Sequence, residues 1–570
     1  MRLLNLSIIF LLLFSCHSSQ PVLKKQIDPY QYEINKKVIA TNGAIASAHP
    51  LASKVGLMIM KNGGNAVDAV IATQLALAVV YPNAGNIGGG GFMVARLANG
   101  ETISLDYREM APGAAHRDMY LDDKGNVIPG LSTLGHLSAG VPGTVAGLFE
   151  SMKYAKLPFE QLIAPAINLA EKGFVITDSE ARGLNNLQPD LKKYNTVSNI
   201  FQKEHGWKAG DTLIQRELAN TLKRIKDQGA AGFYEGETAN LIVAEMKRGK
   251  GIISLEDLKN YKAKWRTPHS FTYRGYKVIS MPMPSSGGVL LNQMLKMVEP
   301  FPLAQYGFHS PEALQLMVEV ERRAYADRAE HLGDADFYNV PISVLVNESY
   351  LKQRMQDFKA GLASTSEDVK PGKIPMNGSE QTTHISVMDK NGNMVAVTTT
   401  LNNSYGSKTI VGGAGFLLND EMDDFSAKPG VPNIYGALGG EANAIAPGKR
   451  MLSAMTPTLV LDNEKPFLVI GTPGGTTIIT SVFQTIVNII DFKLSTEEAV
   501  NKPKFHHQWY PDHVDVEPEF PQNARTALER MGYKINQRSP IGRTEVIRIL
   551  KNGKMEAVAD NRGDDSAAGY

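Results

Sequence analysis

The chain has 570 residues, and its 59 basic and 58 acidic residues leave a formal net charge of only +1. This balance, with no long basic run, disfavours a nucleic-acid-binding protein. Hydrophobic residues make up 43% of the chain, alongside 52 Gly and 30 Pro, which suits a compact, turn-rich enzyme better than a disordered protein. Length alone predicts roughly three or four domains.

The N-terminus is predicted to direct export. Arg2 precedes the short apolar run Leu3–Phe14 and small or polar residues follow, which is typical of a signal peptide over 1–16 and too short for a comfortable transmembrane helix. The only cysteine, Cys16, ends this segment as in a bacterial lipoprotein cleavage site; an ordinary signal peptide with a chance cysteine is the alternative. Because no cysteine remains afterwards, disulfides and cysteine catalysis are excluded from the mature chain. We expect a periplasmic or membrane-anchored protein that continues through a polar linker at 17–37.

Two helices and a strand are predicted next. Apolar residues recur at helical spacing through Leu51–Val80, where Gly63-Gly64 should end the first helix and Asn65 should cap the second. Four glycines at 88–91 precede the strand-like Phe92–Leu97. They lack GxGxxG spacing and a following Lys-Ser/Thr pair, so we expect close backbone packing or a tight turn rather than a nucleotide site.

Arg108 follows the next predicted strand, Glu101–Tyr107, which begins after the hairpin turn Asn99-Gly100. An arginine at a strand end is usually a solvated surface residue. Its guanidinium is also the group best suited to a bidentate grip on a carboxylate. From the residues alone, both interpretations of Arg108 stay open.

The middle of the chain is predicted to be mainly helical from Pro142 to about Lys264. Beyond it we expect a strand at Phe271–Met281 and helices at Gly287–Val298 and Pro311–Gly333. Residues Ser364–Gln381 are polar, contain Gly and Pro and lack apolar periodicity. This is typical of an exposed loop, where proteolytic cuts are tolerated.

A β-hairpin is predicted over Gln381–Asn402, because two Thr-rich apolar runs flank the turn sequence DKNGN. If the loop has three residues, Thr382 falls opposite Thr400; a two-residue loop would shift its partner to Leu401. One hairpin would thus bring two hydroxyls together at its open end. Because Thr pairs are common across strands, an ordinary strand pair is the alternative.

Thr382 could be a nucleophile only with a base beside its hydroxyl. One recognised base is the α-amine of the same residue, with a pKa of roughly 7.7–8.0 that lets it act as base and then as acid. This requires cleavage of the Gln381–Thr382 bond, which the hairpin alone cannot establish. His384 would be a tempting base, but a single His in a strand is more often structural.

Two later segments could also bind a substrate. The acidic run at 420–424 lacks EF-hand spacing, so it is either a solvated turn or a set of carboxylates that holds a cationic amino group. A predicted strand, a turn containing Gly474 and Gly475, and a helix at Ile478–Asp491 would expose backbone N–H groups to a developing anion, unless this is a plain tight turn. The pair His506-His507 has no HExxH or CxxC companion, so no metal or other cofactor is expected.

A set of short motifs occurs in collinear order between about Ala40 and Tyr570: DYREMAP around Arg108, TTHISV at Thr382, TTTLN ending at Asn402, NDEMDDFSAKPGVPN from Asn419, RMLSAMTPT around Ser453, GTPGGT around Gly474, KFHHQW near the end, and a terminal SAAGY. In this combination the chain resembles the γ-glutamyltransferase family, also called γ-glutamyltranspeptidases or glutathione hydrolases, among the N-terminal-nucleophile hydrolases.

The resemblance implies an α+β fold, a four-layer αββα sandwich formed by two subunits of one precursor. A large subunit at 38–381 and a small subunit at 382–570 would form one intertwined unit. Self-cleavage before Thr382 would make this residue first the processing nucleophile and then the catalytic one. It would attack glutathione and related γ-glutamyl compounds and pass the glutamyl group to water, amino acids or peptides.

The resemblance also implies roles for individual residues. By position, Thr400 matches the residue that hydrogen-bonds the nucleophile, Gly474 and Gly475 the oxyanion hole, Arg108 with Ser453 the carboxylate clamp, and Asn402, Glu421 and Asp424 the ammonium-binding group. Ala454 stands where many relatives have a second Ser, so only its backbone can help. Glu421 is Gln in some bacterial relatives. Tyr435 lies in Pro429–Tyr435, which resembles a lid loop that some members carry.

Two other functions stay open. The chain could share the fold and nucleophile but use another acyl donor, as a cephalosporin acylase or a poly-γ-glutamate depolymerase would. From a different class, it could be a non-catalytic exported lipoprotein that keeps the fold for binding. Donor profiling separates the first from a γ-glutamyl enzyme, and failure of the precursor to mature would favour the second.

Overall fold

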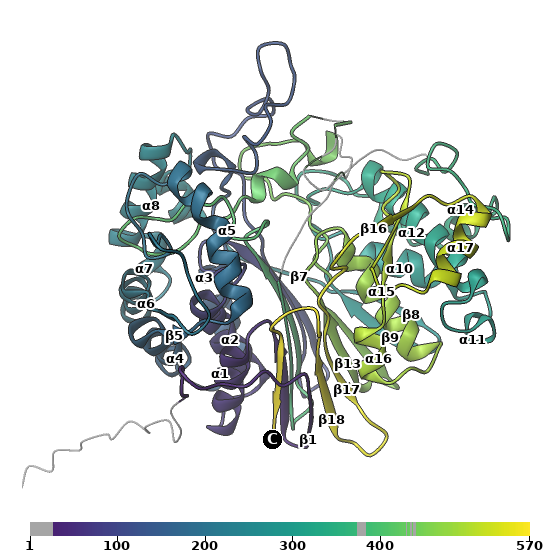
Figure 1. The fold of residues 1–570 in the computed structure, drawn as a ribbon, viewed down its shortest axis with the longest axis horizontal. Coiled ribbons are helices and arrows are strands. Elements are labelled where there is room, and N and C mark those ends of the chain that lie inside the picture. The colour runs from purple at the N-terminus through teal and green to yellow at the C-terminus, as the bar shows by residue number, and fades with distance from the viewer. Residues whose placement is uncertain (1–26, 373–382, 429, 432, 434–435, 437–440) are drawn as a thin grey trace, which may run out of the picture.

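The computed structural model describes residues 27–372, 383–428, 430, 431, 433, 436 and 441–570. Within them, two seven-stranded sheets lie face to face at the centre of the molecule (Figure 1). The first sheet has the order β1 (Lys37–Ala40), β18 (Met555–Ala559), β17 (Glu545–Ile549), β13 (Lys465–Gly471), β12 (Thr458–Asp462), β9 (Tyr276–Ser280), β8 (His269–Tyr273). The second has the order β19 (Ser566–Gly569), β2 (Gly43–Ser47), β10 (Thr383–Asp389), β11 (Met394–Thr400), β3 (Gly90–Arg96), β4 (Thr102–Tyr107), β7 (Lys264–Arg266).

Helices cover the outer face of each sheet, which completes the αββα sandwich (Figure 1). On the second sheet lie α1 (Pro50–Lys61), α2 (Ala66–Val80), α3 (Thr144–Ser151), α4 (Phe159–Lys172), α5 (Asp178–Tyr194), α6 (Arg216–Gln228), α7 (Ala231–Tyr234), α8 (Gly236–Gly249) and α9 (Leu255–Asn260). On the first lie α10 (Gly287–Val298), α11 (Leu303–Tyr306), α12 (Pro311–His331), α13 (Ile342–Leu345), α14 (Glu348–Arg354), α15 (Thr477–Ile490), α16 (Thr496–Asn501) and α17 (Gln522–Met531). Small sheets join β5 (Phe174–Val175) to β6 (Thr212–Leu213), and β14 (Phe505–His506) to β15 (Val514–Val516) and β16 (Ile535–Gln537).

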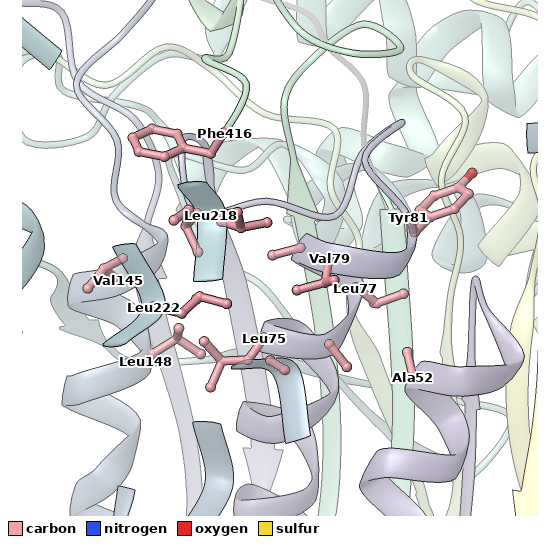
Figure 2. Close-up of a cluster of buried hydrophobic side chains, with 14 of the residues drawn as sticks. Ala52, Leu75, Leu77, Val79, Tyr81, Val145, Leu148, Leu218, Leu222 and Phe416 are labelled. Atoms are coloured by element: carbon pink, nitrogen blue, oxygen red, sulfur yellow. The ribbon is translucent and has the colours of Figure 1, made fainter. Parts of the chain in front are cut away.

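Helix α2 packs against β10 and β11 of the second sheet and against the neighbouring helices α1, α3 and α4. All of its residues are buried, as expected for a helix that is apolar on every side. Its Leu75, Leu77 and Val79 lie in one apolar cluster with Leu148 of α3 and Leu222 of α6 (Figure 2).

The boundary between α1 and α2 is the one the sequence predicts. The Asn65 side chain accepts hydrogen bonds from the backbone N–H groups of Val67 at 2.8 Å and Asp68 at 3.0 Å. Asp68 in turn accepts one from Asn65 N at 2.7 Å. Both partners of this capping box satisfy N–H groups that a helix start leaves without an intrahelical acceptor.

The hairpin β10–β11 occupies the middle of the second sheet, between β2 and β3. Its register pairs Thr383 with Thr399, and Asp389 N donates to Asn393 O at 3.1 Å, as the three-residue loop predicts. The backbone N–H groups of Asn391 and Asn393 also donate to the Asp389 carboxylate, so this side chain stabilises the turn that sets the register.

Each sheet combines strands that precede the 373–382 segment with strands that follow it. In the second, β10 and β11 lie between β2 and β3; in the first, β12 pairs with β9 and β18 with β1. Each seven-stranded sheet is therefore complete only with strands of both parts. The length-based prediction of several domains is wrong for this reason, because two shared sheets and one common interior join the parts.

One predicted strand is wrong. Phe271–Met281 is not a single strand but covers most of the antiparallel hairpin β8–β9, which is closed at Tyr273 and Tyr276. Its turn residues, Arg274 and Gly275, have positive φ angles of 50° and 85°. A glycine inside a β-type run was the signal for this turn.

Candidate functional site

Thr400 is the last residue of β11, at the open end of the β10–β11 hairpin, and it is fully buried. The Thr400 hydroxyl accepts a hydrogen bond from Asn402 N at 2.7 Å, and its carbonyl accepts one from the Asn86 side chain, also at 2.7 Å. A Cβ on Gly89 would lie 1.9 Å from that carbonyl oxygen. The glycine run at 88–91 therefore serves close backbone packing beneath Thr400, as predicted.

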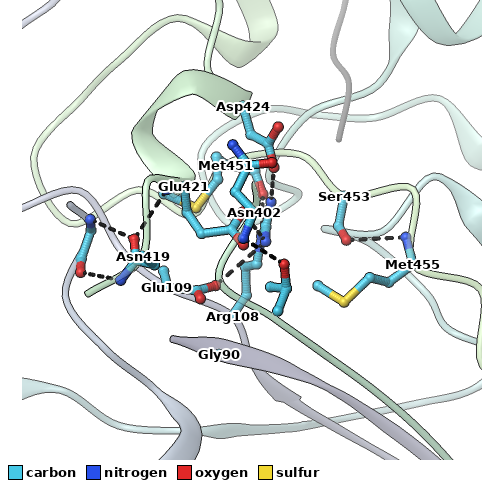
Figure 3. Close-up of polar contacts among 12 residues, drawn as sticks. Gly90, Arg108, Glu109, Asn402, Asn419, Glu421, Asp424, Met451, Ser453 and Met455 are labelled. Atoms are coloured by element: carbon cyan, nitrogen blue, oxygen red, sulfur yellow. Dashed lines mark hydrogen bonds and ion pairs between the residues drawn. The ribbon is translucent and has the colours of Figure 1, made fainter. Parts of the chain in front are cut away.

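Arg108 follows directly after β4 and is completely buried, so the interpretation as a solvated strand end is wrong. Its guanidinium donates to Glu421 and to Asp424, each at 2.5 Å. A third carboxylate, that of Glu109, lies 3.4 Å away, and Met451 O accepts from Nε at 3.3 Å. Figure 3 shows the three acidic side chains gathered around the guanidinium.

This cluster presents both signs of charge in a buried place. It contains one guanidinium and three carboxyl groups, and the Oε1 atom of Glu421 has no hydrogen-bond partner among the residues that the structure describes. Such an arrangement suits a zwitterion, because the guanidinium can bind a carboxylate while the acidic groups bind an ammonium. Sequence reasoning missed Glu109; its place next to Arg108 in the chain was the available signal.

The acidic turn is held by buried amide side chains. The residues Glu421–Asp424 form a short 3-10 helix. Before it, the Asn419 side chain accepts hydrogen bonds from Gly140 N at 2.8 Å and from Glu421 N at 3.1 Å. Asn402, with a positive φ of 68° that asparagine tolerates better than most residues, donates from its side chain to Asp420 O at 2.9 Å. The end of β11 and the acidic turn are thereby fixed to each other.

Ser453 and Ala454 are both buried beside this cluster. The Ser453 hydroxyl accepts a hydrogen bond from Met455 N at 3.2 Å, which Figure 3 shows. Its carbonyl accepts bonds from Ser286 N and Oγ, both at 2.6 Å. The carbonyl of Met451, two residues before Ser453, accepts a hydrogen bond from Arg108. Ser453 therefore lies near the guanidinium that the motifs assign to the carboxylate clamp.

The predicted glycine turn lies where β13 ends at Gly471 and α15 begins at Thr477. Gly474 and Gly475 have φ angles of 139° and 66°, which favour glycine. Gly474 lines a cavity of about 310 Å³ together with Thr383 and Asn402. The helix start and the hairpin end, far apart in sequence, therefore meet at one cavity.

Three predicted site residues, Gln381, Thr382 and Tyr435, lie outside the described residues. His384 is buried, its ring bonded to Thr398 at 2.9 Å and Ser386 at 3.1 Å, and burial lowers its pKa to about 3, which fits a structural role. In the described part of the chain, no three His, Cys, Asp or Glu side chains are grouped as a metal site would need. No helix in that part has both the length and the apolar character to cross a bilayer.

Folding opposes the ionisation of Asp420. It is fully buried and accepts hydrogen bonds from Asn403 N at 2.9 Å and Asn403 Nδ2 at 2.5 Å. Burial raises the pKa of Asp420 to about 7, although Lys408 and the Asn403 contacts partly offset this effect. Because the folded state prefers the protonated carboxyl, ionisation costs stability as the pH rises from about 4 through about 7.

We expect Asp420→Asn, which cannot ionise, to gain stability relative to the parent as the pH rises. The gain between pH 4 and pH 8 should be on the order of a few kcal/mol, at about 1.4 kcal/mol per pKa unit. Urea unfolding at both pH values measures it, with the exposed Asp123→Asn as the control. A difference between variant and parent that is the same at both pH values would contradict the buried ionisation.

A family model described as gamma-glutamyltranspeptidase matches residues 52–570. The chain belongs to the γ-glutamyltranspeptidase family. A curated relative, the glutathione hydrolase proenzyme of Escherichia coli, is 46% identical over 550 residues, which cover 95% of each chain. The family assignment made from the motifs is confirmed.

Solved structures agree with this γ-glutamyltranspeptidase assignment. The γ-glutamyltranspeptidase of Helicobacter pylori matches at 44% identity with a TM-score of 0.57, over 61% of this chain and 97% of that one. A cephalosporin acylase from Bacillus halodurans matches at 27% identity with a TM-score of 0.83, over 96% and 99% of the chains. The predicted α+β fold of four αββα layers is also confirmed.

Proposed function

We propose that the protein is an autoprocessing γ-glutamyl hydrolase and transferase that acts on glutathione and related compounds. The observation that carries the proposal is the buried cluster of Arg108 with Glu109, Glu421 and Asp424. A γ-glutamyl group ends in an α-carboxylate and an α-ammonium, and the cluster offers a partner for each. The relationship to a glutathione hydrolase proenzyme supports glutathione as a donor.

Thr382 is proposed as the nucleophile. In the described hairpin, Thr383 pairs with Thr399, which is the register from which the sequence predicts Thr382 opposite Thr400. Once it is the first residue of a chain, its α-amine takes the hydroxyl proton as Oγ attacks the γ-carbonyl carbon. The C–N bond then breaks, the amine leaves with that proton, and a glutamyl ester remains on Thr382.

Water completes hydrolysis by attacking the ester carbon. Its OH group enters the released glutamate, and its other proton passes through the α-amine to the Thr382 oxygen. An amino acid or peptide amine attacks in the same way and gives a new γ-glutamyl amide. The N–H groups of Gly474 and Gly475 are proposed to stabilise the oxyanion, since they precede the first turn of α15. Ser453 and the backbone of Ala454 would assist Arg108, and Tyr435 would belong to a lid over the site.

Maturation is the first test. Intact mass and N-terminal sequencing of the purified protein should reveal two fragments, a large subunit ending at Gln381 and a small one beginning at Thr382. Incubation with glutathione should then release glutamate. A single chain that stays uncut would leave the nucleophile without its base and would favour a binding protein.

Donor profiling addresses the other acylases of this fold. We expect γ-glutamyl amides to be far better donors than amides of the same length without the α-carboxylate and α-ammonium, because Arg108 and the acidic groups would then have no partners. Poly-γ-glutamate and cephalosporin side-chain amides complete the panel. Equal rates with donors that lack both charges would favour the acylase alternative.

We also propose that the protein is exported and that Cys16, which lies outside the described residues, carries a lipid. The short apolar run before it supports export. Cell fractionation should find the parent in the membrane fraction and a Cys16→Ala variant in the soluble exported fraction. A parent protein that is soluble without detergent would support an ordinary signal peptide instead.

A further inference from the structure

The cavity beside Thr383 is lined by charged side chains that do not belong to the Arg108 cluster. It measures about 310 Å³ and is lined by Thr383, Asn402 and Gly474 on the side of the proposed nucleophile. Arg538 and Arg543, from the segment between β16 and β17, also line it. Among its described lining residues, these two guanidiniums are the charged groups, and no Asp or Glu lines the cavity. The cavity is therefore suited to an anion.

The two arginines differ in how they are held. The Arg543 guanidinium donates twice to Asp565, at 2.9 and 2.8 Å, and once to Tyr81 Oη at 2.5 Å. Arg538 donates to Asp515 at 3.3 Å, and 32% of its side chain is exposed. Arg543 is thus locked into the wall, whereas Arg538 keeps N–H groups accessible at the cavity, since a guanidinium carries five.

Asn402 lies between this cavity and the acidic turn, because it lines the cavity and also donates to Asp420 O. If the glutamyl end of a donor binds at the Arg108 cluster, the other side of the scissile amide must extend away from that cluster. The cavity that adjoins Thr383 and Gly474 is where the amine portion would lie.

We propose that this cavity is the subsite for the leaving amine and the acceptor, and that Arg538 binds the carboxylate of that molecule. The ligand class is an amino acid or short peptide with a free C-terminal carboxylate. This inference rests on the proposed γ-glutamyl transfer.

The test compares two acceptors that differ only in this carboxylate, glycylglycine and glycylglycine amide, with a chromogenic γ-glutamyl anilide as the donor. The mature parent should show an apparent acceptor affinity about tenfold higher for glycylglycine, the equivalent of about 1.4 kcal/mol. Arg538→Gln should bring this ratio close to one, and Arg538→Lys should retain part of it. The matched control is Arg530→Gln, an exposed arginine on α17, which should keep the parental ratio.

A second variant keeps the proposal testable if Arg538→Gln fails to fold. Asn83→Asp is nearly isosteric and places a negative charge on the cavity wall, so it should also reduce the preference for glycylglycine. A parental ratio near one, or the same ratio in the parent and in both variants, would overturn the carboxylate subsite. Absence of anilide turnover in the parent would instead count against the proposed function.

Discussion

Thr382→Ala should remain a single uncut chain and show no measurable γ-glutamyl turnover. The substitution removes the hydroxyl that attacks the preceding peptide bond, so no free α-amine forms at residue 382. It also removes the catalytic nucleophile itself, and loss of a nucleophile typically costs on the order of 10³-fold or more in rate. Mass spectrometry of the purified chain measures the first effect, and release of the chromogenic amine measures the second.

Thr382→Ser is the matched control, because it keeps a hydroxyl and, after cleavage, an α-amine. It should mature and turn over, at rates that differ from the parental ones only through the missing methyl group. If Thr382→Ala yields the two subunits, another residue cuts the chain. If that cut protein also hydrolyses the anilide, Thr382 is not the nucleophile.

The register of the hairpin could be predicted because the information is local. A turn of five residues decides how every position of β10 faces β11, and the Asp389 side chain fixes that turn through bonds to Asn391 and Asn393. The helix boundary at Asn65 is local in the same way. Capping and turn chemistry depend on neighbours in sequence, so both are visible without the fold.

Burial and charge pairing could not be predicted from the residues alone. Arg108 looks like an ordinary strand end until residues more than three hundred positions later fold onto it. Chemistry suggested a carboxylate clamp, but it did not reveal that the clamp and the acidic group form one cluster. Glu109 adjoins Arg108 in sequence, but that neighbourhood alone did not show that both side chains are buried in one cluster. The proposed role of Arg538 depends on the distant segments that form its cavity.

The raised pKa of Asp420 also could not be predicted from the sequence. In sequence it is one of several acidic residues in a turn that could equally be solvated. In the fold it is enclosed by the end of β11, and its carboxylate receives both donors of Asn403. A desolvated carboxyl titrates near neutrality only because the fold excludes water there.

Arg108→Ala should reduce both donor binding and stability. Loss of charge-assisted hydrogen bonds to the substrate carboxylate is worth roughly 1.5–3 kcal/mol, or about a 10- to 100-fold rise in the apparent KM of the donor. In the free protein, three buried carboxyl groups lose their cation, and breaking a buried ion pair typically costs roughly 3–5 kcal/mol. Donor kinetics and urea unfolding of the same preparation separate the two effects.

Arg323→Ala provides the comparison that isolates the binding effect. Arg323 on α12 is just as buried, and it bonds to Glu319, Asp357 and the carbonyl of Arg354 rather than to any residue of the proposed site. Its loss should lower stability to a similar extent while leaving the donor KM at the parental value. A donor KM that stays parental in Arg108→Ala as well would mean that the cluster supports the fold without binding the glutamyl group.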